Sequence, residues 1–243
     1  YFILRWIAAG HAPVSNLFEF ITFFGMMLIF AFIMIYFMYR LNIIGLFALP
    51  LSIIIIAYAS VFPHEIKPLV PSLKSYWLHI HVTTAALGEA ILAISFITGL
   101  IYLIKNIDQK VSTKKTFWLE AVLYFLVTVV GFVVISTAFT ASGYEAKYNW
   151  INKDKVQEEM VYNLPSLVGP HKGELTTKDR FEALAEMPAM VNAKKLNTVI
   201  WSIFAGAALY AIIRLLLRKR IGAFLQPYVQ KVDSELLDEI GYR

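Results

Sequence analysis

The chain has 243 residues, of which 58% are hydrophobic and only 16% charged, and its formal net charge is +5. This composition excludes an ordinary soluble domain, because so few polar residues cannot cover the surface of a globular fold. Cysteine is absent, which excludes a disulfide framework and a thiolate metal site. Basic residues gather at the ends of apolar segments, a pattern that indicates membrane topology and not nucleic-acid binding.

Five apolar segments are each long enough to cross a bilayer core of about 30 Å, for which about 20 residues are needed. They predict membrane helices over residues 17–39, 43–62, 77–104, 117–140 and 197–217. Asn16 and Glu19 have nearly the spacing of a capping box at the first helix, which gives Glu19 a structural role. Pro50 predicts a kink in the second helix. The predicted fold class is therefore an all-α polytopic membrane protein with five transmembrane helices.

A polar stretch separates the fourth and fifth helices, and its charges are evenly balanced. Alternating aromatic and polar residues over 144–150 and 156–162 predict a hairpin around a turn at Asn152–Asp154. Thr177 with Asp179 predicts the start of a short helix carrying Phe181 and Leu184. We expect a small external α+β loop subdomain here.

The chain accordingly divides into four parts. Residues 1–140 hold helices one to four with external histidine-bearing loops, and residues 141–196 form the external loop subdomain. Residues 197–218 form the fifth membrane helix. Residues 219–243 are expected to be a cytoplasmic interfacial tail, with a new helix starting at Ser234, that leads to a missing C-terminal part.

The positions of the basic residues orient the predicted helices. Four lysines fall within residues 105–115, and residues 214–220 read RLLLRKR. Both groups adjoin helix ends, where basic residues mark the inner side of a membrane. Five crossings then place the N-terminus outside and the C-terminus of this chain inside. All the histidines would lie outside, which favours an external imidazole site: His11, His64, His79, His81 and His171.

The third helix carries two of these histidines near its outer end. Residues two apart are separated by about 200° around a helix, so His79 and His81 point to nearly opposite faces and cannot ligate one metal together. Small residues line both faces, so periodicity does not choose between them. The His81 face continues through Thr84, Ala85 and Gly88, and the His79 face through Ala86, Ala90 and Ala93. Two interfacial histidines bonded to headgroups, water or loop carbonyls explain the pattern equally well.

Glu89 offers an alternative function of another class. It lies about 12 Å deeper than His81 and about 80° around the helix from it. A carboxylate at that depth is costly and usually functional or paired. The chain could thus be an ion- or proton-translocating transporter module using Glu89 and the external histidines. A third interpretation is a structural membrane subunit that docks a partner through residues 141–196.

Two segments carry a resemblance to a known family. GHAPVSNLFEF at 10–20 and PLVPSLKSYWLHIHV at 68–82, with NAKKLNTVIW and the closing DEIGYR, resemble the CcsA/ResC family of system II cytochrome c biogenesis, most of all the ResC type of Gram-positive bacteria. The resemblance implies a protein of the bacterial cytoplasmic membrane that handles haem b and delivers it to apocytochrome c on the outer face. It also implies a membrane partner of the CcsB/ResB type and, at most, a part in a cytochrome c synthetase (haem-attachment) complex.

The resemblance also implies a role for one histidine. In that family a histidine after a Trp-Leu pair, just before a transmembrane helix, is an external axial haem ligand, and here this position is His81 in WLHIHV. His79 falls where the family pattern allows a hydrophobic residue and is left unassigned. The family's tryptophan-rich segment (WGWD-like), second external histidine and membrane-embedded histidine are expected beyond Arg243, so we interpret the chain as a fragment. The other residues expected at the site are Trp77, Thr84, Ala85, Gly88 and His11.

Overall fold

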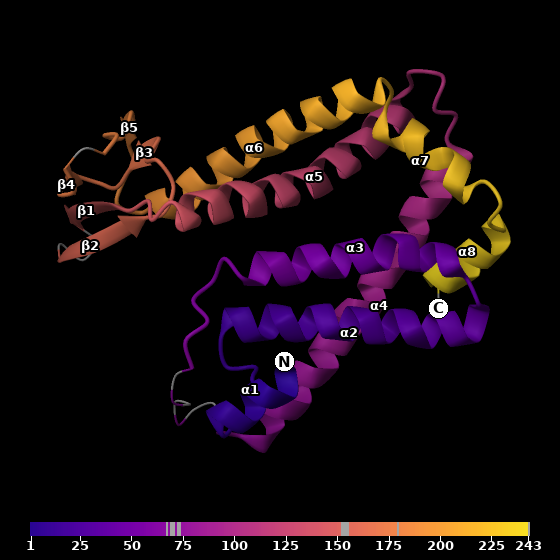
Figure 1. Ribbon diagram of the computed structural model, residues 1–243, viewed down its shortest axis with the longest axis horizontal. Helices are drawn as coiled ribbons and strands as arrows, with labels where there is room; N and C mark the ends of the chain where they lie inside the picture. The colour runs from indigo at the N-terminus through magenta and orange to yellow at the C-terminus, as the bar shows by residue number, and fades with distance from the viewer. Residues whose placement is uncertain (67, 69–70, 72–73, 152–155, 179, 243) are drawn as a thin grey trace. The chain divides into compact units, whose positions relative to one another are not determined.

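The computed structural model describes residues 1–66, 68, 71, 74–151, 156–178 and 180–242. Five of the helices in this part of the chain are long and apolar enough to cross a membrane, which confirms the predicted polytopic architecture (Figure 1). They are α2 (Leu17–Tyr39), α3 (Asn42–Ala59), α4 (Tyr76–Asn106), α5 (Lys114–Ala141) and α6 (Ala193–Leu217). The chain divides into two compact units, Tyr1–Ala121 with Leu217–Arg243 (unit 1) and Val122–Leu216 (unit 2).

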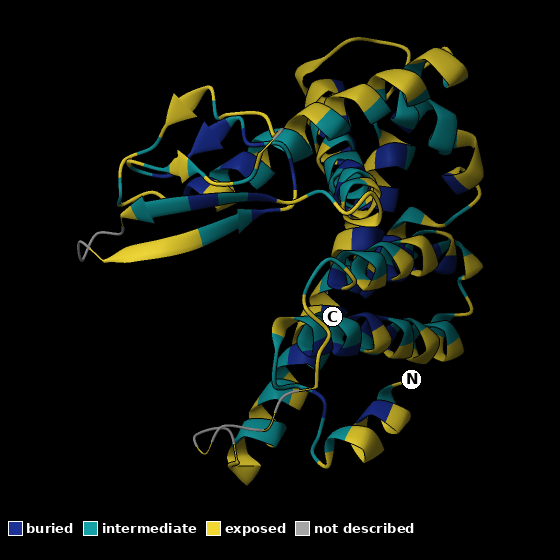
Figure 2. Ribbon diagram, turned by 60° about the vertical axis from the view of Figure 1, so that its left-hand side comes forward, coloured by how far each residue is buried: buried dark blue, intermediate teal, exposed yellow. Residues whose placement is uncertain are grey.

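The membrane helices of unit 1 pack through small residues. Helix α2 contacts both α3 and α4, and α3 also contacts α4. A Cβ atom added to Gly45 would come within 2.7 Å of the Phe32 ring, so a larger residue there would force that ring to move. Arg40 turns the chain between these helices with a left-handed backbone (φ 56°). Pro50 lies within α3. Exposed positions recur along the helices (Figure 2). They include large apolar side chains such as Phe30 and Ile53, which lipid would contact.

Three shorter helices complete unit 1. Helix α1 (Phe2–Ala9) was not predicted, because its eight residues are too few to cross a membrane and carry no helix-start signal. Helices α7 (Ile221–Val229) and α8 (Ser234–Tyr242) form the C-terminal part, and α8 begins at the predicted Ser234. Both pack against α4.

The C-terminal helices are bonded to the last turns of α4. The Gln226 side-chain amide donates to the carbonyl oxygens of Ile104, Lys105 and Ile107 at 3.2, 3.3 and 3.0 Å, and so caps the end of that helix. Lys105 Nζ donates to the Val232 carbonyl oxygen. The tail predicted as interfacial is therefore a packed part of unit 1.

Helices α5 and α6 run side by side in unit 2 (Figure 1). Their backbones meet at two glycines: a Cβ atom added to Gly131 would come within 2.7 Å of the Gly206 nitrogen. Tyr124 Oη donates to the Ile203 carbonyl oxygen at 3.2 Å. Close contact between small residues is the usual way in which membrane helices associate, since lipid supplies no hydrophobic driving force between them.

The segment that connects α5 to α6 in the sequence contains the strands of unit 2, which form two small sheets. Strands β1 (Ala146–Ile151) and β2 (Gln157–Tyr162) pair antiparallel, and β4 (Glu174–Leu175) pairs with the other edge of β1. Strands β3 (Val168–Gly169) and β5 (Ala185–Glu186) form a parallel pair. Ala146, Tyr148 and Tyr162 form the buried core. The predicted hairpin is confirmed, and its proposed turn at Asn152–Asp154 lies outside the described residues.

The short helix predicted from Thr177 is wrong. Among the described residues between Thr177 and Leu184 the chain has no helix, and Asp179 lies outside them. Thr177 Oγ1 accepts a hydrogen bond from the Lys147 backbone nitrogen at 3.0 Å, and the Thr176 nitrogen donates to the Lys147 oxygen at 2.9 Å. Thr177 therefore does not cap a helix. Its hydroxyl oxygen, which would accept a backbone N–H at a helix start, accepts the N–H of Lys147 in β1 instead.

Candidate functional site

Helix α4 presents one packed side and one open side. The packed side is a single stripe at helical spacing: Ala86, Ala90, Ile94, Ile97, Ile101 and Ile104 are all buried. His79 begins this stripe, seven residues before Ala86, and is half-buried. Its Nδ1 is buried and has no hydrogen-bond partner among the described residues. His79 is therefore directed toward the packed side of α4, away from the face that carries His81.

His81 lies on the open side of α4. Its side chain is exposed, as are those of Thr84 and Trp77, the last being 76% exposed. Gly88 follows on the same face, where an added Cβ atom would meet no heavy atom within 4 Å. Ala85 is half-buried at the margin. The structure thus brings together all of the expected site residues that α4 carries, on a face where unit 1 leaves space.

The hydroxyl of Thr84 is bonded within its own helix. Its Oγ1 lies 2.9 Å from the Ile80 carbonyl oxygen and 3.0 Å from the His81 carbonyl oxygen, and donates to this pair. A hydroxyl bonded back to the preceding turn is not directed at a ligand. Thr84 therefore contributes a small, satisfied surface beside His81.

His11 lies on a separate segment, directly after α1. Gly10 ends that helix with a left-handed backbone (φ 70°), a conformation that suits glycine. The His11 Nδ1 lies 3.0 Å from the Ala12 carbonyl oxygen, and its Nε2 is buried with no hydrogen-bond partner among the described residues. The contacts of His11 are thus with its own loop, and the structure shows none with His81.

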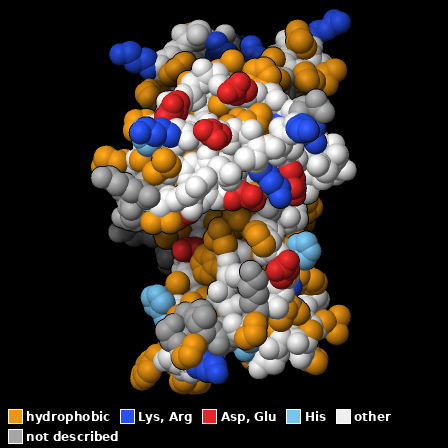
Figure 3. Space-filling view, turned by 90° about the vertical axis from the view of Figure 1, so that its left-hand side faces the viewer, with side chains coloured by type: hydrophobic (Ala, Val, Ile, Leu, Met, Phe, Trp, Pro, Cys, Tyr) orange, Lys and Arg blue, Asp and Glu red, His pale blue; other side chains and the backbone are white. Residues whose placement is uncertain are grey.

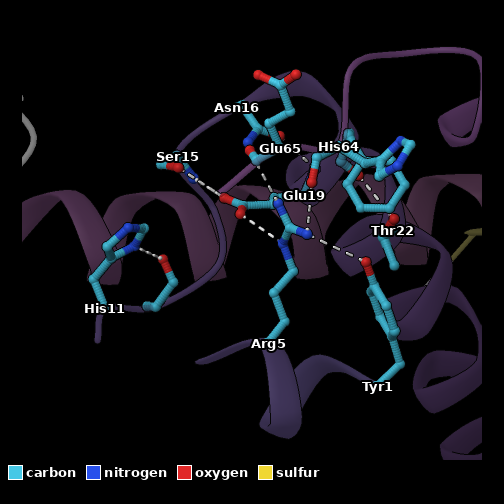
Figure 4. A network of polar contacts seen from close by, with 11 residues as sticks. Tyr1, Arg5, His11, Ser15, Asn16, Glu19, Thr22, His64 and Glu65 are labelled. Carbon is cyan, nitrogen blue, oxygen red and sulfur yellow. Dashed lines mark hydrogen bonds and ion pairs between the residues drawn. The ribbon is translucent and has the colours of Figure 1, made fainter. Parts of the chain in front are cut away.

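A buried ion pair lies beside this loop, and sequence reasoning missed it. Arg5 Nε donates to Glu19 Oε1 at 2.7 Å, and the two side chains are only 8% and 1% exposed (Figure 4). Glu19 Oε2 accepts from both the nitrogen and the hydroxyl of Ser15, each at 2.8 Å. The Asn16 side chain accepts from the Glu19 nitrogen at 2.9 Å, which confirms the predicted cap. A buried carboxylate is stabilised by a nearby cation. The only sequence feature that indicated such a partner was therefore the acidic Glu19 at the start of an apolar helix, with Arg5 as the nearest arginine or lysine before it.

Arg5 also reaches the loop that follows α3. Its Nη1 donates to the His64 carbonyl oxygen at 2.9 Å and its Nη2 to that of Glu65 at 3.5 Å (Figure 4). The His64 ring is exposed, and its centroid lies 6.0 Å from that of Phe18. Arg5 therefore joins α1, the start of α2 and the end of α3 at one end of unit 1.

The remaining histidine belongs to unit 2. His171 Nδ1 lies 3.0 Å from Glu186 Oε1, which also accepts from the Lys172 nitrogen at 2.6 Å. The hydrogen bond from Lys172 and the neighbouring imidazole hold the pKa of the exposed Glu186 carboxyl below its ordinary value. His171 thus has a structural partner, and the predicted gathering of all five histidines on one membrane side stays a prediction.

The ligands available to a metal can be stated for the described part of the chain. There, no group of three or more His, Cys, Asp and Glu side chains is arranged to hold a metal ion. Glu89 is exposed on α4 and does not extend the His81 face. His81 nevertheless fits haem in one respect, since it offers an exposed imidazole above a small-residue surface where a planar group can lie. It can supply one axial ligand to haem iron.

Comparison with known proteins gives the family. Residues 14–152 match the model of the cytochrome C assembly protein family. The chain is 35% identical over 120 residues to the cytochrome c biogenesis protein CcsA of Heterosigma akashiwo, a match that covers 48% of this chain and 37% of the relative. It is 34% identical over 118 residues to CcsA of Guillardia theta, covering 46% of this chain and 39% of the relative.

The match to CcsA of Prochlorococcus marinus is 37% identical over 108 residues, covering 43% of this chain and 34% of the relative. The chain thus spans less than two fifths of the length of these curated relatives. No solved structure matches. The family model covers more than half of the 243 residues and includes α2, α3 and α4 with its histidines His79 and His81. This chain therefore belongs to the cytochrome c assembly protein family.

Proposed function

We propose that this protein handles haem and delivers it to apocytochrome c on the outer face of the bacterial cytoplasmic membrane, with His81 as an axial ligand of haem b. The observation that carries the proposal is the arrangement of α4. His81 stands on the open face beside Trp77 and Gly88, whereas His79 stands on the packed stripe. Helical periodicity did not distinguish these two histidines as haem ligands. The packing of unit 1 favours His81, because it leaves that side chain exposed.

The chemistry of the open face suits this role. A neutral imidazole is a good ligand for haem iron, and an exposed one can bind without rearranging the helix. Gly88 and Ala85 lack the bulk to block a porphyrin plane, and the Trp77 ring can pack against its edge. His81 would supply one nitrogen ligand from this chain, and the exposed face would leave the bound haem accessible to another group.

The partners follow from the family assignment and the resemblance. CcsA-named relatives are biogenesis proteins for cytochrome c, and we extend this role to the present chain, including the finer ResC type. We propose a CcsB/ResB-type membrane partner and at most a share in a haem-attachment complex. Thioether formation uses thiols, which the apocytochrome would supply because this chain has none.

Paired substitutions on α4 test the ligand. We expect His81→Ala in the full-length protein to lose or weaken bound haem, and added imidazole to restore part of the haem spectrum. His79→Ala is the matched control, two residues away on the packed side, and should leave the spectrum nearly unchanged. Gel filtration of both variants would show whether they stay folded. Loss of haem with His79→Ala and retention with His81→Ala would place the site on the other face of α4.

A further inference from the structure

The loop before β3 is bonded to the first turns of a membrane helix. Asn197 of α6 is buried; its Oδ1 accepts from the Leu167 nitrogen at 2.8 Å and its Nδ2 donates to the Pro165 oxygen at 3.0 Å. One turn further along, Trp201 Nε1 donates to the same Pro165 oxygen at 2.7 Å. Asn197 and Trp201 lie about 6 and 12 Å along α6 from Ala193. The loop therefore lies alongside the start of α6, level with its first turns.

A set of exposed apolar side chains is fixed to that same loop. The Phe181 oxygen accepts from Ser166 Oγ at 3.0 Å, and the Leu184 nitrogen donates to the Leu167 oxygen at 3.0 Å. Phe181 is 52% exposed and Leu184 73% exposed. Short links thus hold both residues close to the Ser166–Leu167 segment, which is bonded to the first turns of α6.

Two further apolar residues stand directly before α6. Met190 is 91% exposed and Val191 40% exposed, and the helix starts only two residues after Val191. We call Phe181, Leu184, Met190 and Val191 the apolar rim. The strands of unit 2 carry four acidic side chains and one basic side chain. Charges of both signs and hydrophobic side chains appear together on the face of the molecule seen in Figure 3. Ile151 and Val156 at the other end of the hairpin are exposed too, but the apolar rim is the set beside the start of a membrane helix. Exposed apolar residues so placed mark an interaction surface.

The depth of the rim selects its occupant. Trp201 is an indole about two turns inside α6, a position typical of the membrane–water interface. Lys194 and Lys195 begin the same helix, where their ammonium groups can reach lipid headgroups. A surface held beside these anchors would lie at the headgroup and acyl boundary. Further along α6, Val199 and Ile203 are exposed as well, as lipid-facing residues of a membrane helix would be.

We propose that the apolar rim inserts into the leaflet that α6 enters, so that the strand region of unit 2 lies on the membrane surface and not free above it. Asn197 and Trp201 are the positioning residues, because they hold the rim at this depth. The occupant is the lipid bilayer. The proposal concerns unit 2 alone and does not depend on haem binding.

The absence of cysteine permits a direct test. Leu184→Cys and, separately, Met190→Cys would each give one labelling site in the full chain, at exposed positions whose replacement disturbs no core. Gln157→Cys is the matched control, because it is exposed and pairs with Ile151 at the far end of the hairpin from Ala146 and Tyr162. Each variant would carry an environment-sensitive NBD label or a nitroxide in phosphatidylcholine vesicles.

At the rim positions we expect a blue-shifted NBD emission, severalfold stronger quenching by nitroxide-bearing lipid than at Gln157, and nitroxide collisions with oxygen that exceed those with a water-soluble nickel chelate. Water-like emission at both rim positions would overturn the proposal. So would shielding from oxygen and nickel chelate alike, which indicates a protein contact. Loss of the rim signal in an Asn197→Ala variant that keeps its helical circular dichroism would support the positioning role.

Discussion

Arg5 shows what single residues decide in this protein. Its pairing with Glu19 spans 14 positions and its bonds to the loop after α3 span about 60, so no local pattern in the sequence could reveal them. Glu19 was correctly predicted to belong to a helix cap, because that role depends on Asn16 three residues away. The sequence did not reveal that the Glu19 carboxylate pairs with Arg5, because that contact depends on tertiary packing.

We expect Arg5→Ala to destabilise unit 1 by about 3–5 kcal/mol, since it leaves the Glu19 carboxylate buried without its cation. Thermal unfolding in detergent, followed by tryptophan fluorescence, would measure the loss. Glu19→Gln should also destabilise, because it leaves Arg5 as the uncompensated charge. The double variant Arg5→Ala with Glu19→Gln should be less destabilised than the sum of the two single changes, and an additive effect would argue against the ion pair.

Tyr162 gives the sheet region a dependence on alkaline pH. Burial, and after it the neighbouring Tyr148, raises the pKa of Tyr162 far above the usual value of about 10. The folded state thus holds the phenol proton more tightly than the unfolded state. The stability that this contributes is complete below about pH 10 and is lost as the pH rises above it. Near-UV circular dichroism should show unit 2 losing structure there, and Tyr162→Phe should move the transition to higher pH. An unchanged midpoint would contradict the assignment.

At the scale of elements, the sequence predicted the membrane helices but not which helices pack against one another. The bounds predicted for the first membrane helix agree with α2 at both ends, because length and apolar composition determine a crossing. Helix α8 begins at the predicted Ser234, whereas α1 and α7 were not predicted, because each is too short to cross a membrane. The two faces of α4 are both lined by small residues, so only the packed structure distinguishes them.

Gly88 allows the open face of α4 to be tested without harming the fold. A side chain there meets no heavy atom within 4 Å, so Gly88→Leu should leave thermal stability nearly unchanged while reducing haem loading in the full-length protein. Gly99→Leu is the control, since Gly99 is equally open but about 16 Å further along the helix. Haem content by absorbance measures both variants. Equal haem loading in the two would remove Gly88 from the site.

At the scale of the whole molecule, the five crossings are established while their direction is a prediction. Unit 1 gathers basic residues from segments distant in the sequence: Arg220 Nη1 donates to the Val111 oxygen at 3.4 Å, and Lys105 is bonded to Val232. These residues share one end of their helices, which is the arrangement that the positive-inside rule requires of an inner face. The sequence supplied the same conclusion from position alone, because charge at helix ends is a local property.

We therefore expect a single cysteine at Gln157 to react with a membrane-impermeant maleimide in intact cells. A cysteine at Lys110, exposed on the connection between α4 and α5, should react only after the cells are permeabilised. Gel shift of the labelled protein reads out both positions. The reverse pattern would invert the topology and move His81 to the inner face, against the proposed delivery to an external apocytochrome.

The hydrogen bonds of Arg5 can form only in the order in which their partners are synthesised. Arg5 and Glu19 leave the ribosome close together and can pair early, but the carbonyl oxygens of His64 and Glu65 are made only after both α2 and α3. The guanidinium can complete its bonds only once α3 has returned the chain to the side from which α2 departed. The finished network thus requires that α2 and α3 have both crossed the membrane in the correct sense.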